Sequence, residues 1–309
     1  MSYLPSLYTA FPHIDLVVVP LGADQPGIEL QSHRRGAHAV LSLKAHAPVH
    51  CRVRPDCLLL GHLHHAGPRS RIDGVALATG MSFTVVPKRE CDIILDRGTS
   101  ASIVLTSSEA RLDDGNLPGL FPLQGNLAPW SGSRALVDAP LREAHEDVQR
   151  SLRMYDYDKS GDAFDRRIRA LISRQITSSL SIDDEAGPSP VVGHRCRYFI
   201  FKRAVEFMLD NLHKEIYISD LCEAALVSER TLRYAFEHVA GLSPTRYLFY
   251  LRLGSTCRDL MLSCPDKVSV ASVALKRGMW DLSRFAGGYL RVFGEYPSDT
   301  LRRQLAVIA

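Results

Sequence analysis

A helical unit that occurs twice in the last third of the chain limits its fold more than any other feature. The first copy ends at Gly241–Pro244 and the second ends 53 residues later at Gly294–Pro297. Shifted by that period, three apolar positions coincide: Leu232 with Phe285, Phe236 with Tyr289, and Val239 with Val292. The same shift aligns Ser228 with Asp281, two residue types that cap helix N-termini well. Each copy therefore predicts a capped helix with one apolar face.

A shorter apolar helix precedes each capped helix. It covers Ser219–Ala225 in the first copy, with Leu221, Cys222 and Ala225 facing inward, and Ser269–Lys276 in the second, with Val270, Val273 and Ala274 facing inward. A short helix, a tight turn and a capped helix make a helix-turn-helix. We place the first unit at about residues 218–239 and the second at about 269–293, joined by a helix over Pro244–Leu262. This arrangement predicts an all-α domain over residues 195–309 that binds double-stranded DNA.

The order of residues resembles the AraC/XylS family of bacterial transcription regulators. The segments that carry the resemblance are Ile218-SDLCEAALVSERTLRYAFEHVAGLSPTRYLFYLRL and Val268-SVASVALKRGMWDLSRFAGGYLRVFGEYPSDTLRR, within about the last 115 residues. Within the family, the sequence is most similar to the subgroup that contains the ethanolamine-operon regulator. The resemblance implies regulation of transcription, with RNA polymerase as a further partner.

Two positions depart from the family pattern. The turn of the first unit usually has glycine, and this chain has Leu226, which predicts a strained or differently built turn. The second unit keeps Gly278 in its turn but has Gly287 and Gly288 inside its second helix. Each of these glycines destabilises a helix by roughly 0.5–1 kcal/mol relative to alanine. We therefore expect the second helix to be the weaker one.

The outward residues of the two capped helices are the predicted DNA contacts. In the first unit they are Ser228, Arg230, Thr231, Arg233 and Tyr234, and in the second they are Leu282, Ser283, Arg284, Ala286 and Gly287. Arginine is suited to the O6 and N7 acceptors of guanine, whereas four residues of the second unit cannot make a bidentate base contact: Leu282, Ser283, Ala286 and Gly287. We expect the first unit to read bases. The second is expected to contribute shape readout, thymine-methyl contact and, through Arg284, phosphate contact.

Charge is divided between the two parts of the chain. Residues 191–309 contain 17 Lys and Arg against 12 Asp and Glu, and residues 1–190 contain 20 against 22. A basic segment beside a mildly acidic one fits a DNA-binding domain joined to a domain that does not bind DNA. The 7 cysteines are irregularly spaced and argue against a disulfide framework. We see no signal peptide or membrane-spanning run, which predicts a cytoplasmic protein without membrane contact.

The first 182 residues predict a separate domain that is β-rich to about residue 110 and helical from about residue 140. Its predicted strands lie at Leu16–Val19, Val40–Leu43, Leu58–Leu63, Met81–Val86, Asp92–Leu95 and Ser102–Thr106. Their spacing suggests an antiparallel barrel or sandwich. The family resemblance implies a cupin-like domain that binds a small-molecule effector or forms a homodimer. The whole chain is thus predicted to be α+β.

Two helices and a linker complete this prediction. The first helix is expected at Leu141–Met154, and the second has an apolar face of Ala163, Phe164, Ile168, Leu171, Ile172, Ile176 and Leu180. Periodicity alone does not distinguish packing on the β-domain from a dimer interface. An acidic run with proline and glycine over residues 183–194 is the predicted linker.

Two sequence patterns suggest metals, and neither is complete. His62, His64 and His65 include a His-x-His pair, but no carboxylate ligand follows. Residues 156–167 begin like a calcium loop with Asp156, Asp158, Ser160 and Asp162, yet Arg167 stands where glutamate is required. We therefore predict that the protein binds no metal ion or cofactor and is not an enzyme.

The sequence favours a DNA-binding transcription regulator controlled by a small molecule. One rival is a metal-dependent cupin enzyme fused to a DNA-binding domain, with His62 and His64 as ligands. The other is a regulator without a small-molecule ligand. The sequence does not identify the effector, the operator or the direction of regulation.

Overall fold

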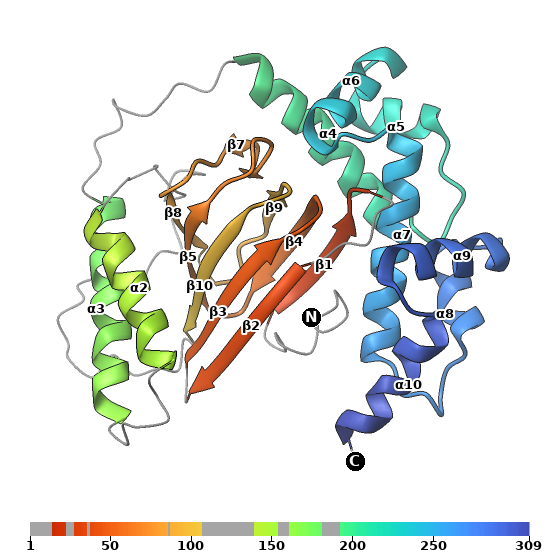
Figure 1. The fold of residues 1–309 in the computed structure, drawn as a ribbon. Helices are drawn as coiled ribbons and strands as arrows, with labels where there is room; N and C mark the ends of the chain where they lie inside the picture. The colour runs from red at the N-terminus through yellow and green to blue at the C-terminus, as the bar shows by residue number, and fades with distance from the viewer. Residues whose placement is uncertain are drawn as a thin grey trace.

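The computed structural model describes residues 14–22, 28–35, 38–85, 87–106, 139–153, 161–180 and 192–308. Two β-sheets come first along the chain, a pair of helices follows, and a helical domain ends it (Figure 1). The architecture is therefore an N-terminal β-sheet domain and a C-terminal helical domain.

The N-terminal strands form two five-stranded antiparallel sheets. The first sheet has the order β1 (Ile14–Pro20), β4 (Val49–Pro55), β9 (Cys91–Leu95), β6 (Arg71–Ile72) and β7 (Val75–Ala76). The second has the order β2 (Ile28–Arg35), β3 (His38–Ala45), β10 (Ser100–Thr106), β5 (Leu58–His65) and β8 (Ser82–Val85). Among the described strands, no pairing joins the two sheets, so they form a sandwich rather than a closed barrel.

The six strands predicted from the sequence correspond to β1, β3, β5, β8, β9 and β10. Strands β2, β4, β6 and β7 were not predicted. In β4, Val49, Cys51 and Val53 alternate with polar residues, a pattern that usually indicates one solvated face. Here His50 is buried as well, because the helical domain covers that face.

Helices α2 (Ala139–Arg153) and α3 (Gly161–Leu180) cover the outer face of the second sheet (Figure 1). Strand alternation separates two cores here, because Leu59 and Leu63 of β5 belong to the main core, whereas Leu60 faces the helices. The helix-facing core contains Val40, Leu60 and Val104 from the sheet with Val148, Phe164, Ile168, Leu171 and Ile172 from the helices. Within one chain, the sheet thus buries four residues of the apolar face predicted on α3: Phe164, Ile168, Leu171 and Ile172.

Seven helices form the C-terminal domain along the described residues. They are α4 (Val192–Asp210), α5 (Ile218–Ala225), α6 (Glu229–Ala240), α7 (Pro244–Leu262), α8 (Val270–Lys276), α9 (Leu282–Phe293) and α10 (Pro297–Ile308). The predicted joining helix Pro244–Leu262 is confirmed by α7. Of the predicted linker over residues 183–194, residues 183–191 lie outside the described part, and α4 begins at Val192.

The two domains share one continuous core, and α7 lies directly against β1. Gly254 of α7 faces the backbone of β1 so closely that a Cβ atom there would overlap the carbonyl oxygen of Val18. Beside this contact, Arg258 of α7 forms an ion pair with Asp15 of β1. A glycine is therefore required where the helix and the strand meet.

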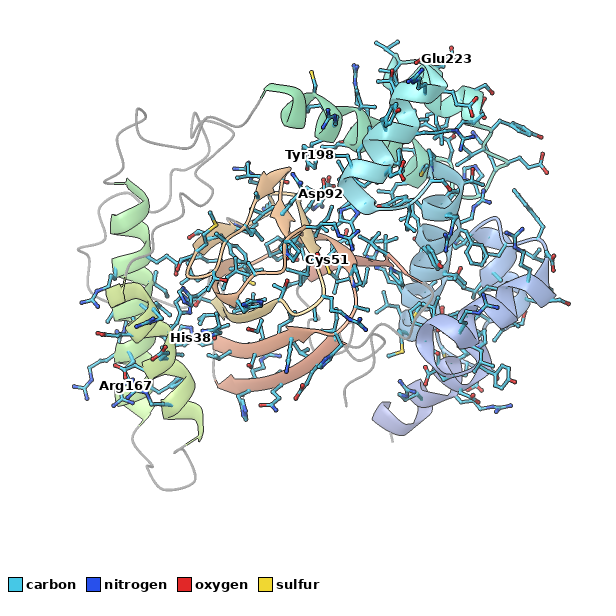
Figure 2. The ribbon with its side chains drawn as sticks, turned by 45° about the horizontal axis from the view of Figure 1, so that its top comes forward. His38, Cys51, Asp92, Arg167, Tyr198 and Glu223 are labelled. Atoms are coloured by element: carbon cyan, nitrogen blue, oxygen red, sulfur yellow. The ribbon has the colours of Figure 1, made fainter. Side chains whose placement is uncertain are left out.

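A buried polar network crosses the same junction. Nε2 of His50 lies 3.1 Å from Oδ1 of Asp92, and its Nδ1 lies 2.6 Å from the Tyr247 hydroxyl of α7. The Tyr198 hydroxyl of α4 donates to Oδ2 of Asp92 at 2.9 Å, and Figure 2 shows Tyr198 and Asp92 close together at this junction. Burial raises the pKa of Asp92, but hydrogen bonds from His50 and Tyr198 and the charge of Arg52 outweigh it and lower the pKa to about 2.

Candidate nucleic-acid interface

The turn of the first unit is built around a left-handed leucine. Leu226 has φ 56° and ψ 43°, and its backbone N–H donates to the carbonyl oxygen of Glu223 at 3.1 Å. A non-glycine residue in this region of the φ/ψ plane destabilises the fold by about 1–2 kcal/mol. Of the two turns predicted for this position, strained or differently built, the structure shows the strained one. The Leu226 side chain is 74% exposed.

Helix α6 begins as predicted and buries the predicted face. The Ser228 side chain accepts from the backbone N–H of Thr231, and Gly241 ends the helix with φ 69°. Leu232, Phe236 and Val239 are buried. The predicted DNA contacts Ser228, Arg230, Thr231, Arg233 and Tyr234 are all exposed on the other side.

The two arginines of this face are held by different neighbours. Arg233 donates from Nε and Nη2 to Oε1 of Glu229, at 2.8 and 2.5 Å. The guanidinium of Arg230 lies 5.7 Å from the ring centre of Tyr234, within the range of a cation–π contact. Together with Glu237, these residues line a shallow surface along α6.

The second unit repeats this construction with a different outward face. Oδ1 of Asp281 accepts from the backbone N–H of Arg284 at 2.9 Å, and Gly294 ends α9 with φ 72°. Leu282, Ser283, Arg284 and Gly287 are exposed, and Ala286 is half-buried. The guanidinium of Arg284 lies 5.3 Å from the ring centre of Phe249 on α7. Of the five predicted contacts, Arg284 alone has a charged side chain.

The two glycines inside α9 have different surroundings. A Cβ atom on Gly288 would lie 2.7 Å from Cζ of Phe249, whereas a Cβ atom on Gly287 would have nothing within 4 Å. Gly288 thus allows α9 to approach α7 closely. Gly287 has no packing requirement in the described part of the chain.

Helix α7 packs against both capped helices, α6 and α9, which are the recognition helices of the two units. Its Tyr247 packs edge-on against Phe236 of α6, with ring centres 5.4 Å apart, and its Phe249 contacts α9 through Gly288 and Arg284. One rigid helix therefore fixes the relative placement of α6 and α9 (Figure 1).

The histidines of β5 lie outside this interface, and His62 is directed toward α2. His62 is fully buried, and its ring stacks on His145 of α2 with ring centres 5.2 Å apart. Nε2 of His64 lies 2.5 Å from the Ser102 hydroxyl, and His65 is exposed. Among the described residues, no group of three or more His, Cys, Asp or Glu is arranged to hold a metal ion. The calcium-like residues Asp156, Asp158 and Ser160 lie outside the described part.

Comparison with known proteins agrees with this geometry. A model of a helix-turn-helix domain matches residues 221–303. The XylDLEGF operon transcriptional activator 2 of Pseudomonas putida is 39% identical over 113 residues, which are 36% of this chain and 68% of that protein. The XylDLEGF operon transcriptional activator 3 of the same species is 42% identical over 106 residues, 34% of this chain and 31% of that protein. The chain thus spans about a third of the length of activator 3 and about two thirds of the length of activator 2.

Two solved structures are similar to this chain, with TM-scores below 0.5. A probable AraC family transcriptional regulator from Rhodopseudomonas palustris is 30% identical, with a TM-score of 0.31 over 34% of this chain and 96% of that one. The AraC-like transcriptional activator CuxR is 12% identical, with a TM-score of 0.40 over 91% of both chains. The assignment of this chain to a family therefore depends on its sequence relatives and not on these structures.

Two capped helices on one joining helix define the class of helix-turn-helix proteins with a duplicated unit. The chain belongs to the AraC/XylS family of transcription regulators. Along the described residues, none of the helices is long and apolar enough to cross a membrane.

Two features of this region were not foreseen from the sequence. The ion pair between Glu229 and Arg233 was missed, although a glutamate four residues before an arginine on a helix is a recognisable signal. The contact between α7 and β1 was also missed, and no local pattern indicates it.

Proposed function

We propose that this chain is a sequence-specific DNA-binding transcription regulator whose two units contact successive turns of the major groove. The observation that carries the proposal is the pair of capped helices α6 and α9, both exposed at their N-terminal faces and both packed on α7. Helix-turn-helix proteins insert this part of the second helix into the groove.

We assign unequal roles to the two units. Arg230 and Arg233 of the first unit contact base edges, with Ser228, Thr231 and Tyr234 beside them. In the second unit Arg284 contacts phosphate, and Leu282, Ser283, Ala286 and Gly287 provide an uncharged surface for close approach. The exposure of the arginines and the absence of a long donor other than Arg284 among the second set support this division.

In vitro selection from a random duplex library with the full-length protein tests the proposal. A single enriched motif, with contacts on two successive groove faces, is expected. Arg233→Ala should lower affinity for that motif, while Arg150→Ala on α2 serves as a control because Arg150 is exposed and distant in the fold. A protein that enriches no motif at moderate salt is not the regulator proposed here.

The N-terminal domain is the proposed regulatory part. We propose that residues 1–182 form a cupin-like domain that binds a small-molecule effector or a second copy of the chain, in a cytoplasmic protein that also contacts RNA polymerase. The shared core between the sheets and α7 supports coupling of this domain to the DNA-binding one. Thermal-shift screening of metabolites tests effector binding, since a ligand of the folded state raises the melting temperature.

The finer likeness to the ethanolamine-operon regulator subgroup also stays a proposal. It depends on Leu221–Glu223, the non-glycine turn residue Leu226, Gly278–Ala286 and Thr300–Arg303. Mapping the bound promoters would test it, because the neighbouring genes identify the regulated pathway.

A further inference from the structure

The recognition face of α6 includes a carboxylate as well as two arginines. Glu229 occupies the first turn of α6, immediately after the Ser228 cap. Its Oε1 accepts two hydrogen bonds from Arg233, one from Nε at 2.8 Å and one from Nη2 at 2.5 Å. Both side chains are about half exposed, so this pair lies on the face that meets DNA in the proposed function.

The geometry determines which edge of the guanidinium remains available. Glu229 engages the edge formed by Nε and Nη2, so the hydrogens of Nη1 and the second hydrogen of Nη2 point away from it. That remaining edge is the one that can donate to guanine O6 and N7 together. The charged hydrogen bonds also remove rotamer freedom that an isolated arginine would lose on binding.

The pair changes the electrostatics of the helix as well. An unpaired arginine attracts any phosphate, whatever the sequence. With Glu229 beside it, the local charge is balanced, and the carboxylate repels a backbone that approaches without an acceptor for the free edge of Arg233. Contacts to DNA that lacks the preferred base are therefore weakened more than contacts to the preferred motif.

The second unit lacks both members of this pair. A shift of 53 residues places Leu282 at the position of Glu229 and Ala286 at the position of Arg233. Arg284, near the start of α9, instead lies over the Phe249 ring. Of the two capped helices, α6 alone has a carboxylate-braced arginine among the described residues, since the Arg277 that pairs with Asp259 lies in the turn before α9.

We propose that Glu229 is a specificity-determining, positioning residue, which acts through Arg233 to confine base reading to one edge of its guanidinium. This inference rests on the proposed function, because it assumes that α6 contacts DNA. Glu229 is not a base contact in this mechanism, and its effect disappears when Arg233 is absent.

The test uses the full-length protein and four variants: Glu229→Ala, Arg233→Ala, the double variant and Glu237→Ala. Glu237 is the matched control, because it lines the same surface of α6 but forms no ion pair with Arg233 among the described residues. Each protein is first used in duplex selection. Its affinity is then measured for the wild-type motif, for that motif with the Arg233-dependent base changed, and for unrelated duplex DNA.

Glu229→Ala is expected to reduce discrimination at the Arg233-dependent base by roughly fivefold, a part of the discrimination that a bidentate pair provides. The affinity of Glu229→Ala for unrelated DNA should rise at least as much as that of Glu237→Ala. The double variant should discriminate no worse than Arg233→Ala, since the two residues act as one unit. Circular dichroism and melting temperature should be the same for Glu229→Ala and Glu237→Ala.

Two results would overturn the inference. If Arg233→Ala loses discrimination but Glu229→Ala behaves like Glu237→Ala, or if the two losses add in the double variant, Glu229 does not position Arg233. If the wild-type protein selects no motif, the proposed function fails and the inference fails with it. The first result leaves the proposed function standing.

Discussion

Helices α6 and α9 begin and end in the same way and differ in what they expose. Each starts after a side-chain cap, Ser228 or Asp281, and each ends at a glycine with positive φ, Gly241 or Gly294. Their buried stripes coincide position by position, yet the outward face of α6 presents Arg230 and Arg233, whereas that of α9 presents Arg284 among small and apolar residues. The comparison teaches that the scaffold of a duplicated unit is constrained separately from its binding face.

The reason lies in what each position must satisfy. The caps must accept from backbone N–H groups at the start of a helix, and the buried positions must pack toward α7. These requirements are the same for both units. Outward positions are free of those demands and can change with the DNA contacted. Each of the following predictions compares the two units, from the largest expected effect to the smallest.

The buried positions of the two helices should be equally sensitive to truncation. Phe236 and Phe285 lie at different positions of the repeat, but both belong to the buried stripe and both are fully buried or nearly so. Replacement of either by alanine should lower the free energy of unfolding by about 3–5 kcal/mol. Urea denaturation of the two variants measures this. A loss for Phe285→Ala below half of that for Phe236→Ala would show that the scaffolds are not equivalent.

Acid should destabilise the fold beneath the first unit, because Asp92 becomes protonated. The folded-state pKa of Asp92 is about 2, below its ordinary value of 3.8, so its stabilisation is present above pH 3.8 and is lost as the pH falls toward 2. The difference corresponds to about 2 kcal/mol. Its hydrogen-bond partner Tyr198 lies on α4, which packs on α5 and α6.

Unfolding curves between pH 5 and pH 2 test this, with Asp92→Asn compared with Asp299→Asn on the exposed surface of α10. Asp92→Asn should be less stable at neutral pH and should show a flatter decline in acid. A decline as steep as that of Asp299→Asn would contradict the role given to Asp92.

The outward faces should differ in their effect on DNA binding. Arg233→Ala should weaken binding to the preferred motif by on the order of 1–3 kcal/mol and relax one base position. Ser283→Ala should change affinity less and leave the base preference intact. Competition binding at fixed salt measures both, and equal losses of specificity would refute the division between the units.

The smallest predicted effects concern the glycines of α9. Gly287→Ala should stabilise the protein by about 0.5–1 kcal/mol, because its Cβ atom enters open space and alanine favours the helix. Gly288→Ala should destabilise it, because the new methyl group would press on Phe249. Thermal unfolding compares the pair, and a gain in stability for both would show that α9 can move away from α7.

Local patterns predicted the helical domain well and the β-domain in part. Ser228 and Asp281 located the two recognition helices because a cap and a helical stripe lie within a few residues of each other. Strand β4 escaped prediction because His50 and Arg52 read as solvent-facing positions. The burial of His50 depends on Tyr247, 197 residues further along the chain. No periodic pattern within a short stretch of sequence indicates such a long-range contact.

The close approach of Gly254 to Val18 limits how freely this architecture can be recombined. A sensor domain transplanted onto these helices would need a first strand that fits against a side-chain-free position on α7. It would also need a histidine–aspartate pair to receive Tyr247 and Tyr198. Chimaeras joined at the predicted linker take β1 and β4 from one parent and α7 from the other. They should therefore fold poorly unless these strands are changed to match α7.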